Sequence, residues 1–463
     1  MIHQITTTDA KLILAHPSLA KNASAAAKDA GLGTQVFLFS DEPCNPIDRV
    51  EDWREFIALP VEAERWTWKT MTGNEAAKAP ATVNFSSGTT GMPKGVCVSH
   101  RNLVANVVQT IFMKYLKKPW KESNHPPERW VGFLPLYHAY GQLWTILMAC
   151  HLLVPVYIIK QFSYAEFLNV VQTYRITHLQ VAPPILVMLS KRPETSRYDL
   201  SSLTDCLCGA APLSKELQNE CSKRFGMEIV QGWGMTEVTC GAMHVPGGTI
   251  DDSGSVGQLH PNCEVILLDD DGKEVGEGQP GEMYVRGPQV CLCYWKNEAA
   301  TKEALSEDGW LKTGDVAVMK NGWYWIVDRK KVSNPQLNSD QFTHILQELI
   351  KVNALQVAPA ELEAVLLEHD DIADAAVVGV TLHDEEWPRA YVALKDHAKG
   401  KLTEKQIQDW MKGKVAKHKQ LVGGVTFVDE VPKLASGKIM RKVLKDWAKR
   451  DAPFLEKKVK ARL

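Results

Sequence analysis

The sequence lacks the features that identify several broad classes of protein. Acidic and basic residues nearly balance, 55 Asp and Glu against 53 Lys and Arg, so no overall positive charge indicates a nucleic-acid partner. The most apolar stretch, residues 143–159, contains His151 and Pro155, which favours a buried helix and strand over a membrane span. We therefore expect that the protein has no nucleic-acid partner and is not an integral membrane protein.

The ten cysteines lack the spacing of a metal site. None forms a Cys-x-x-Cys pair or a pattern with histidine. Two pairs, Cys206 with Cys208 and Cys291 with Cys293, lie two residues apart, as residues on one face of a strand do. We interpret the cysteines as reduced thiols of the core.

Residues 85–96 are rich in the residue types that bind phosphate. Glycine, serine and threonine alternate and lead to Lys94, which stands between Pro93 and Gly95, so the stretch is neither a Walker loop nor a dinucleotide fingerprint. Glycines let consecutive N–H groups turn toward one anion, while hydroxyls and an ammonium add donors and charge. A surface turn is the alternative, but the length and composition favour a phosphate-binding loop. The predicted phosphate ligands are Ser86, Ser87, Gly88, Thr89, Thr90, Gly91 and Lys94.

The hydrophobic pattern indicates an α/β fold. Residues 11–40 are expected to form a strand, a helix and a strand. Residues 81–85 are expected to form a buried strand, and the phosphate-binding loop then leaves the edge of its sheet. Residues 255–286 contain short strands and Gly/Asp turns, which predicts a small β-rich subdomain. Beyond the charged group at residues 328–331, helices and strands alternate in a small α+β domain.

The phosphate loop resembles the signature loop of the adenylate-forming superfamily, which includes acyl-CoA synthetases, 4-coumarate-CoA ligases, firefly-type luciferases and peptide-synthetase adenylation domains. Further stretches extend the resemblance over nearly the whole chain, namely residues 134–141, 209–212, 231–237, 313–315 and 432–438. The resemblance implies a large AMP-binding domain at residues 1–327, a hinge at residues 328–331 and a small mobile C-terminal domain at residues 348–463.

The resemblance also implies a site for ATP and Mg²⁺. Trp233 offers a face to the purine, Asp315 accepts the ribose hydroxyls with Arg329 as its partner, and Glu237 reaches the magnesium on ATP. The strand-end residues implied to hold adenine and phosphate are Ala210, Ala211, Pro212, Gln231, Gly232, Trp233, Gly234 and Thr236.

Three residues are implied to act on the acyl group. A carboxylate is a poor electrophile, so a ligase first joins it to AMP and expels pyrophosphate. Lys438 would bridge the carboxylate and the α-phosphate, and His138 would gate the acyl pocket, although a lone histidine before a helix is more often structural. After the small domain rotates, Lys351 would belong to the face that receives the thiol.

The resemblance implies an acid-thiol ligase, and the acid is expected to be uncharged. Ala139, Tyr140 and Gly141 lack the aspartate that amino-acid-activating domains place nearby, which favours an aryl, arylalkanoic or fatty acid. No carrier segment follows, so free coenzyme A is the expected thiol. The alternative is a non-catalytic or defective paralogue that binds ATP or the acid without completing the thioester.

Two departures from the family accompany the resemblance, and the chain ends in a tripeptide similar to a targeting signal. Relatives carry further elements before the region that Met1 begins, so we expect the large domain to be incomplete at its start. Residues 332–347 form a polar insertion where relatives run from the hinge directly into Glu-Leu-Ile-Lys. The chain ends in Ala461-Arg462-Leu463, similar to the Ser-Lys-Leu address, which predicts the peroxisome, and otherwise the cytoplasm.

We predict that residues 332–347 are encoded by a retained intron. Val332-Ser333 can be encoded by GTAAGT and Gln347 by CAG, the usual ends of an intron, and removal in frame joins Lys331 to Glu348. Sequencing of the transcript should recover messages without these codons. If every message contains them, the segment is a genuine loop of this protein.

Overall fold

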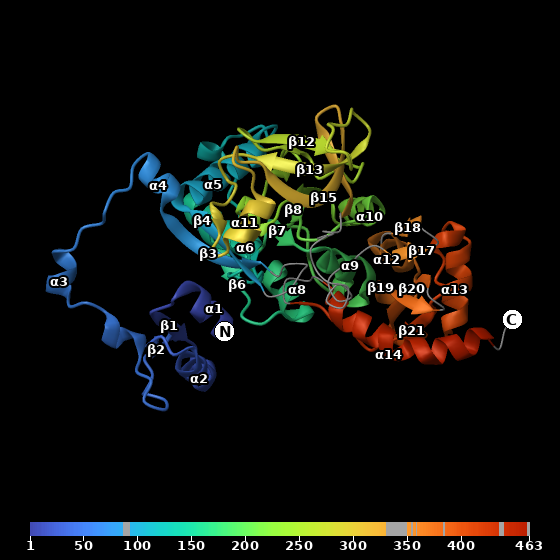
Figure 1. Cartoon of the computed structure of the whole chain (residues 1–463), viewed down its shortest axis with the longest axis horizontal. Helices are drawn as coiled ribbons and strands as arrows, with labels where there is room; N and C mark the ends of the chain where they lie inside the picture. Colours follow the sequence, from blue (N-terminus) through green and yellow to red (C-terminus); the bar gives the residue numbers. More distant parts are fainter. Residues whose placement is uncertain are drawn as a thin grey trace. The chain divides into compact units, whose positions relative to one another are not determined.

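The computed structural model describes residues 1–86, 93–329, 350–352, 355–357, 359–382, 385–434 and 439–460 (Figure 1). These ranges form an α/β structure, as the sequence predicts. Contacts divide the chain into two compact units, Met1–Leu103 with Cys291–Ser306, and Val104–Val290 with Glu307–Leu463. Within the described ranges, no helix is long and apolar enough to cross a bilayer. The predicted insertion at residues 332–347 lies outside them.

The first unit begins with the predicted strand, helix and strand. Strands β1 (Leu12–Ala15) and β2 (Gln35–Leu38) pair in parallel, and helix α2 (Ala20–Ala30) connects them. The helix buries Ala20, Ala23, Ala26 and Ala27, and it ends at Gly31, whose φ of 69° suits glycine. Small side chains on one face of α2 therefore allow the helix to pack closely.

The phosphate-loop region differs from the expected arrangement at a parallel sheet edge. Strands β3 (Pro80–Ser86) and β4 (Lys94–Ser99) pair antiparallel, with Ser86 opposite Lys94, and β14 (Cys293–Tyr294) pairs with the other edge of β4. Lys94, Gly95 and Val96, which the sequence places in the phosphate-binding loop, therefore belong to a strand. The reason is burial, because five consecutive residues of β4 after Lys94 are buried in this three-stranded sheet.

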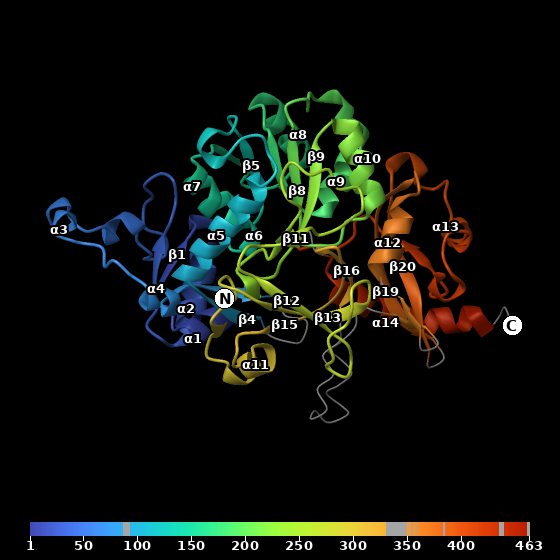
Figure 2. The same ribbon diagram turned by 90° about the horizontal axis from the view of Figure 1, so that it is seen from above.

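The second unit contains a seven-stranded sheet with the order β11-β10-β9-β8-β7-β5-β6. Its parallel strands are β5 (Trp130–Gly132), β6 (Val156–Ile158), β7 (His178–Val181), β8 (Asp205–Cys208) and β9 (Glu228–Trp233). At one edge, the short strand β10 (Met243–His244) pairs antiparallel with β9, and β11 (Gln258–Leu259) pairs antiparallel with β10. The crossover helices are α8 (Tyr164–Thr173), α9 (Pro183–Lys191) and α10 (Lys215–Phe225), seen beside β8 and β9 in Figure 2.

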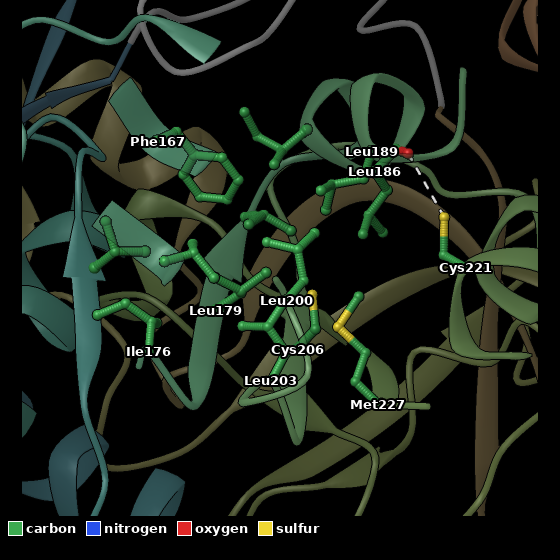
Figure 3. Packing of buried hydrophobic residues seen from close by; sticks show 14 of the residues in the cluster. Phe167, Ile176, Leu179, Leu186, Leu189, Leu200, Leu203, Cys206, Cys221 and Met227 are labelled. Carbon is green, nitrogen blue, oxygen red and sulfur yellow. Dashed lines mark hydrogen bonds between the residues drawn. The ribbon is translucent and has the colours of Figure 1, made fainter. Parts of the chain in front are cut away.

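A hydrophobic core joins these helices to the sheet (Figure 3). On α8, Phe167, Leu168 and Val171 are fully buried, and Ser163 caps the helix by accepting a hydrogen bond from the Glu166 backbone. The helical spacing of these residues places them on one face of α8, and this face packs against the core. Each such side chain contributes about 1.5–3 kcal/mol by burial. This packing fixes the strand ends that carry the candidate site.

Charged residues gather at the amino-terminal ends of the parallel strands, opposite the strand ends that carry the candidate site. Lys118 donates hydrogen bonds to Asp205 at 2.7 Å and to Glu228 at 2.9 Å, which are the first residues of β8 and β9. Lys114 lies 2.9 Å from Glu128, and both side chains are buried. Since a buried charge without its partner is strongly unfavourable, these pairs hold the amino-terminal ends of the strands in register.

The β-rich subdomain is a four-stranded antiparallel sheet, as the sequence predicts in part. Its strands are β12 (Glu264–Leu268), β13 (Pro280–Arg286), β15 (Leu311–Lys320) and β16 (Trp323–Arg329). The sequence places its start at residue 255 but does not show that β15 and β16 complete it. The acidic run before Gly272 is a hairpin turn, in which the Asp269 carboxylate accepts from the Lys273 backbone.

The C-terminal ranges have cores of their own. Helix α12 (Pro359–Leu367) packs on β19 (Ile372–Leu382), β20 (Glu385–Leu394) pairs with β19, and β21 (Val425–Phe427) pairs with β20. The remaining elements are β17 (Ile350–Val352), β18 (Leu355–Val357), α13 (Glu404–Lys412) and α14 (Arg441–Lys460). The predicted α+β character of this region is confirmed.

Candidate active site

The carboxyl ends of β8 and β9 carry two of the predicted nucleotide segments. The strands are parallel neighbours, with Cys208 opposite Gln231, so Gly209 to Pro212 follow β8 and Gly234 to Glu237 follow β9 at the same end of the sheet. Ala210 adopts φ 70°, a left-handed conformation that costs energy for a residue other than glycine. Strained backbone of this kind is concentrated at functional sites, which supports this edge as a binding site.

Trp233 is joined to the predicted ribose carboxylate. Its ring is 8% exposed, and its indole Nε1 donates a hydrogen bond of 2.9 Å to Asp315 Oδ2 on β15. Arg329 Nε on β16 lies 3.2 Å from Asp315 Oδ1. An aromatic ring, a carboxylate and a guanidinium from three strands therefore meet. The three side chains predicted to bind the nucleoside are thus brought together, and their binding role stays a prediction.

Thr313, Gly314 and Asp315 lie within β15, at an irregularity in its pairing with β13 rather than after a turn. Gly314 has φ 74°, and the Asp315 backbone donates to Thr313 Oγ1 at 3.1 Å. Thr313 in turn donates to the Met283 carbonyl at 2.7 Å. The Thr-Gly-Asp sequence thus has a structural explanation, because glycine permits the bulge in β15 and threonine anchors it to β13.

Glu237 is buried in the short helix Thr236–Val238 that follows β9. Mg²⁺ keeps several waters and binds through one or two carboxylates and the phosphates of its substrate. Within the described ranges, no three His, Cys, Asp or Glu side chains gather into a metal centre. A single carboxylate at this position suits an Mg²⁺ ion that is held mainly by a nucleotide.

Two residues that the sequence does not single out shape the segment after Glu237. Thr239 adopts φ 66° and ψ −52°, an outlier for a β-branched residue, and donates to the Gln289 carbonyl at 2.7 Å. Asn106 donates to the Gly241 carbonyl at 2.7 Å and accepts from the Gly241 backbone at 3.1 Å. Only contacts distant in sequence reveal these roles, so no local signal could have found them.

The predicted acyl segment meets the predicted adenine segment. The buried Tyr140 donates its hydroxyl to the Leu207 carbonyl at 2.9 Å. A Cβ at Gly209 would lie 3.5 Å from the Tyr140 ring. His138 Nδ1 accepts a hydrogen bond of 3.2 Å from the Tyr140 backbone and so caps the helix that follows. His138 therefore has the structural role that the sequence left open, and a gating role stays a prediction.

The remaining predicted residues are described only in part. Ser86 Oγ donates to the Lys94 carbonyl at 3.5 Å, and Lys94 Nζ lies 4.9 Å from the ring centroid of Tyr294. The backbone of Lys351 pairs with Gln356 in β17 and β18. The predicted residues outside the described ranges are Ser87, Gly88, Thr89, Thr90, Gly91 and Lys438.

Two histidines lie buried near this region. His244 on β10 is 5% exposed, and the rings of His244 and Trp144 stack with centroids 6.5 Å apart. Within the described ranges, neither ring nitrogen of His260 has a hydrogen-bond partner. Burial lowers the pKa of His260 from 6.5 to about 3, and the neighbouring His244 adds to the effect. Burial, with repulsion from Lys114, lowers the pKa of His244 to about 4.

We predict that stability declines in mild acid because of these histidines. His178, whose pKa burial lowers to about 4, behaves in the same way. All three histidines stay neutral in the folded protein but take up protons on unfolding below pH 6.5. Their contribution to the free energy of unfolding is therefore fully present above pH 6.5 and is lost as the pH falls toward 4. Each histidine adds about 1.4 kcal/mol per pH unit to the slope of unfolding free energy.

Urea unfolding of the full chain between pH 7 and pH 5 measures this slope. His260→Phe should reduce the slope of unfolding free energy against pH by the amount due to one proton. Carboxylates contribute equally to the slopes of the unmodified protein and the variant. Equal slopes for the two proteins would contradict the prediction.

The sequence matches two protein-family profiles, one described as AMP-binding enzyme over residues 1–295 and one as AMP-binding enzyme C-terminal domain over residues 361–438. A probable 4-coumarate–CoA ligase of Dictyostelium discoideum is 40% identical over 375 residues, covering 80% of this chain and 63% of that protein. An acyl-CoA synthetase of Alternaria alternata is 34% identical over 464 residues, covering 97% of this chain and 75% of that protein.

The fold is similar to the crystal structure of ATP-bound MatB from Rhodopseudomonas palustris. The TM-score is 0.76 at 25% sequence identity, and the alignment covers 97% of this chain and 81% of that one. The chain spans 63% to 64% of the length of the Dictyostelium relatives that it matches.

Proposed function

Because the chain belongs to the AMP-binding enzyme family, we propose that it is an ATP-dependent acid-thiol ligase. It would adenylate a carboxylic acid and transfer the acyl group to coenzyme A. The observation that supports this most directly is the cluster of Trp233, Asp315 and Arg329. Relatives named as CoA ligases and acyl-CoA synthetases support the choice of thiol.

In the proposed reaction, residues of the second unit hold the nucleoside. Asp315 would accept the ribose hydroxyls while Arg329 balances its charge, and Trp233 would offer its ring to the purine. Glu237 would bind Mg²⁺, which offsets the charge of the triphosphate. The hydrogen bond from Trp233 to Asp315 orients both groups before ATP arrives.

The chemical steps are assigned to residues of the C-terminal region and the phosphate loop. Ser86, the following hydroxyl residues and Lys94 would hold the leaving phosphates. Lys438 would bridge the acid carboxylate and the α-phosphate, which brings two anions within reaction distance. Lys351 would then act on the adenylate when the thiol attacks, as part of a second arrangement of the C-terminal domain.

We propose an uncharged aryl, arylalkanoic or fatty acid as the substrate. The acyl segment supports this choice, because Ala139, Tyr140 and Gly141 carry no charge and the buried Tyr140 hydroxyl donates to the neutral Leu207 carbonyl. The alternative function is a defective paralogue that stops after binding ATP or acid. The insertion beside the hinge is the observation that favours it.

We predict different effects for the two proposed catalytic lysines. In the full chain, Lys438→Ala should lower ATP–pyrophosphate exchange by about 100-fold or more while ATP still binds, because Lys438 is the residue proposed to bridge the acid carboxylate and the α-phosphate. Lys351→Ala should slow thioester formation more than exchange. A screen of aryl, arylalkanoic and fatty acids by exchange identifies the substrate for both measurements.

Lys433→Ala is the matched control. This lysine lies on the same segment as Lys438, but its Nζ donates to Asp374 at 2.6 Å, so exchange should change little. Unchanged exchange in Lys438→Ala would refute the role of that lysine. Binding of ATP with no exchange for any acid would identify the defective paralogue.

We also propose import into the peroxisome through Ala461-Arg462-Leu463, which lies outside the described ranges. The tripeptide has the small, basic and leucine pattern of the Ser-Lys-Leu address. A fluorescent protein fused in front of this tail should colocalise with a peroxisomal marker, and removal of Leu463 should disperse it. Diffuse fluorescence with the intact tail would contradict this localisation.

A further inference from the structure

Cys97 and Cys293 face each other across two paired strands. Cys97 lies on β4 and Cys293 on β14, and the antiparallel register places them directly opposite. Residues opposite each other project to the same face of a sheet, with Cβ atoms about 4.5–5.5 Å apart. Their Cα separation, about 4.5–5.5 Å, lies within the range that a disulfide spans. The pairing alone therefore brings two thiols within bonding reach.

The surroundings of the two thiols differ. Cys97 is 1% exposed, and burial raises its pKa to about 12, with the charge of Cys293 and a hydrogen bond between the two side chains adding to the effect. Cys293 is only partly buried. A reagent from solvent therefore reaches Cys293 first, while Cys97 stays protonated beside it.

We propose that Cys97 and Cys293 form a redox-active dithiol that a peroxide converts to an intrachain disulfide. The Cys293 sulfur attacks one peroxide oxygen, the O–O bond breaks, and Cys293 becomes a sulfenic acid with release of water. The Cys97 sulfur then displaces the hydroxyl group of the sulfenic acid, which leaves with the Cys97 proton as a second water. Two thiols are oxidised, and one hydrogen peroxide is reduced to two waters.

The position of the dithiol links it to the predicted phosphate loop. Strand β4 starts at Lys94, and its Val96 lies opposite Tyr294, the residue that follows Cys293. Lys94 extends over the Tyr294 ring. A disulfide would join β14 covalently to the strand on which the loop returns. This inference rests on the strand pairing and does not depend on the proposed enzymatic activity.

The full reduced chain, treated with hydrogen peroxide and then alkylated, tests the proposal. Non-reducing peptide mapping should find a peptide of Cys97 joined to one of Cys293, lighter by two hydrogen atoms than the separate peptides and released by dithiothreitol. Cys291→Ser is the matched control, because Cys291 is buried two residues before Cys293 but is not opposite Cys97, and the crosslink should persist.

Cys97→Ser supplies the second readout. Without its partner, Cys293 should accumulate as the sulfenic acid, which dimedone labels. Crosslinks in the unmodified sequence that use Cys291 in place of Cys293 would overturn the proposal, as would oxidation of Cys293 to the sulfinic acid with Cys97 left as a thiol. Mapping of the unmodified sequence decides the matter even if Cys97→Ser does not fold.

Discussion

The parallel pairing of β8 with β9 is the constraint on which the candidate site depends. It carries two glycine-containing segments to one sheet edge, where Ala210 is held in a left-handed conformation and Trp233 reaches Asp315. At the other end of the same strands, Lys118 binds the first residue of each. The strands are thus fixed at one end by charge and along their length by apolar packing, so the other end can hold strained backbone.

Much of this arrangement could be predicted from the sequence. The alternation of apolar runs with turn residues gave the α/β class, because parallel strands require a crossover that returns the chain to the same edge. Trp233, Asp315 and Arg329 were selected from three separate motifs, and the structure places their side chains in contact. Residues so far apart in the chain meet only because the fold brings β9, β15 and β16 together.

Other features could not be predicted, for identifiable reasons. The hairpin of β3 and β4 was missed because Lys94 reads as the end of a glycine-rich loop, whereas burial in a three-stranded sheet makes it the start of a strand. Thr239 has a positive φ, which β-branched residues rarely adopt, and its hydrogen bond to the distant Gln289 carbonyl explains this conformation. The helix-capping contact of His138 is local, yet it does not decide whether the ring also acts on substrate.

The contact of Tyr140 with Gly209 has a consequence for redesign of this protein. The ring stands between the segment expected to select the acid and the segment expected to hold adenine, and the hydroxyl is fixed to β8. Side chains that share a packing partner do not respond independently to substitution. A change made only to enlarge the acyl side would therefore alter the apparent affinity for nucleotide as well, and the two specificities would have to be optimised together.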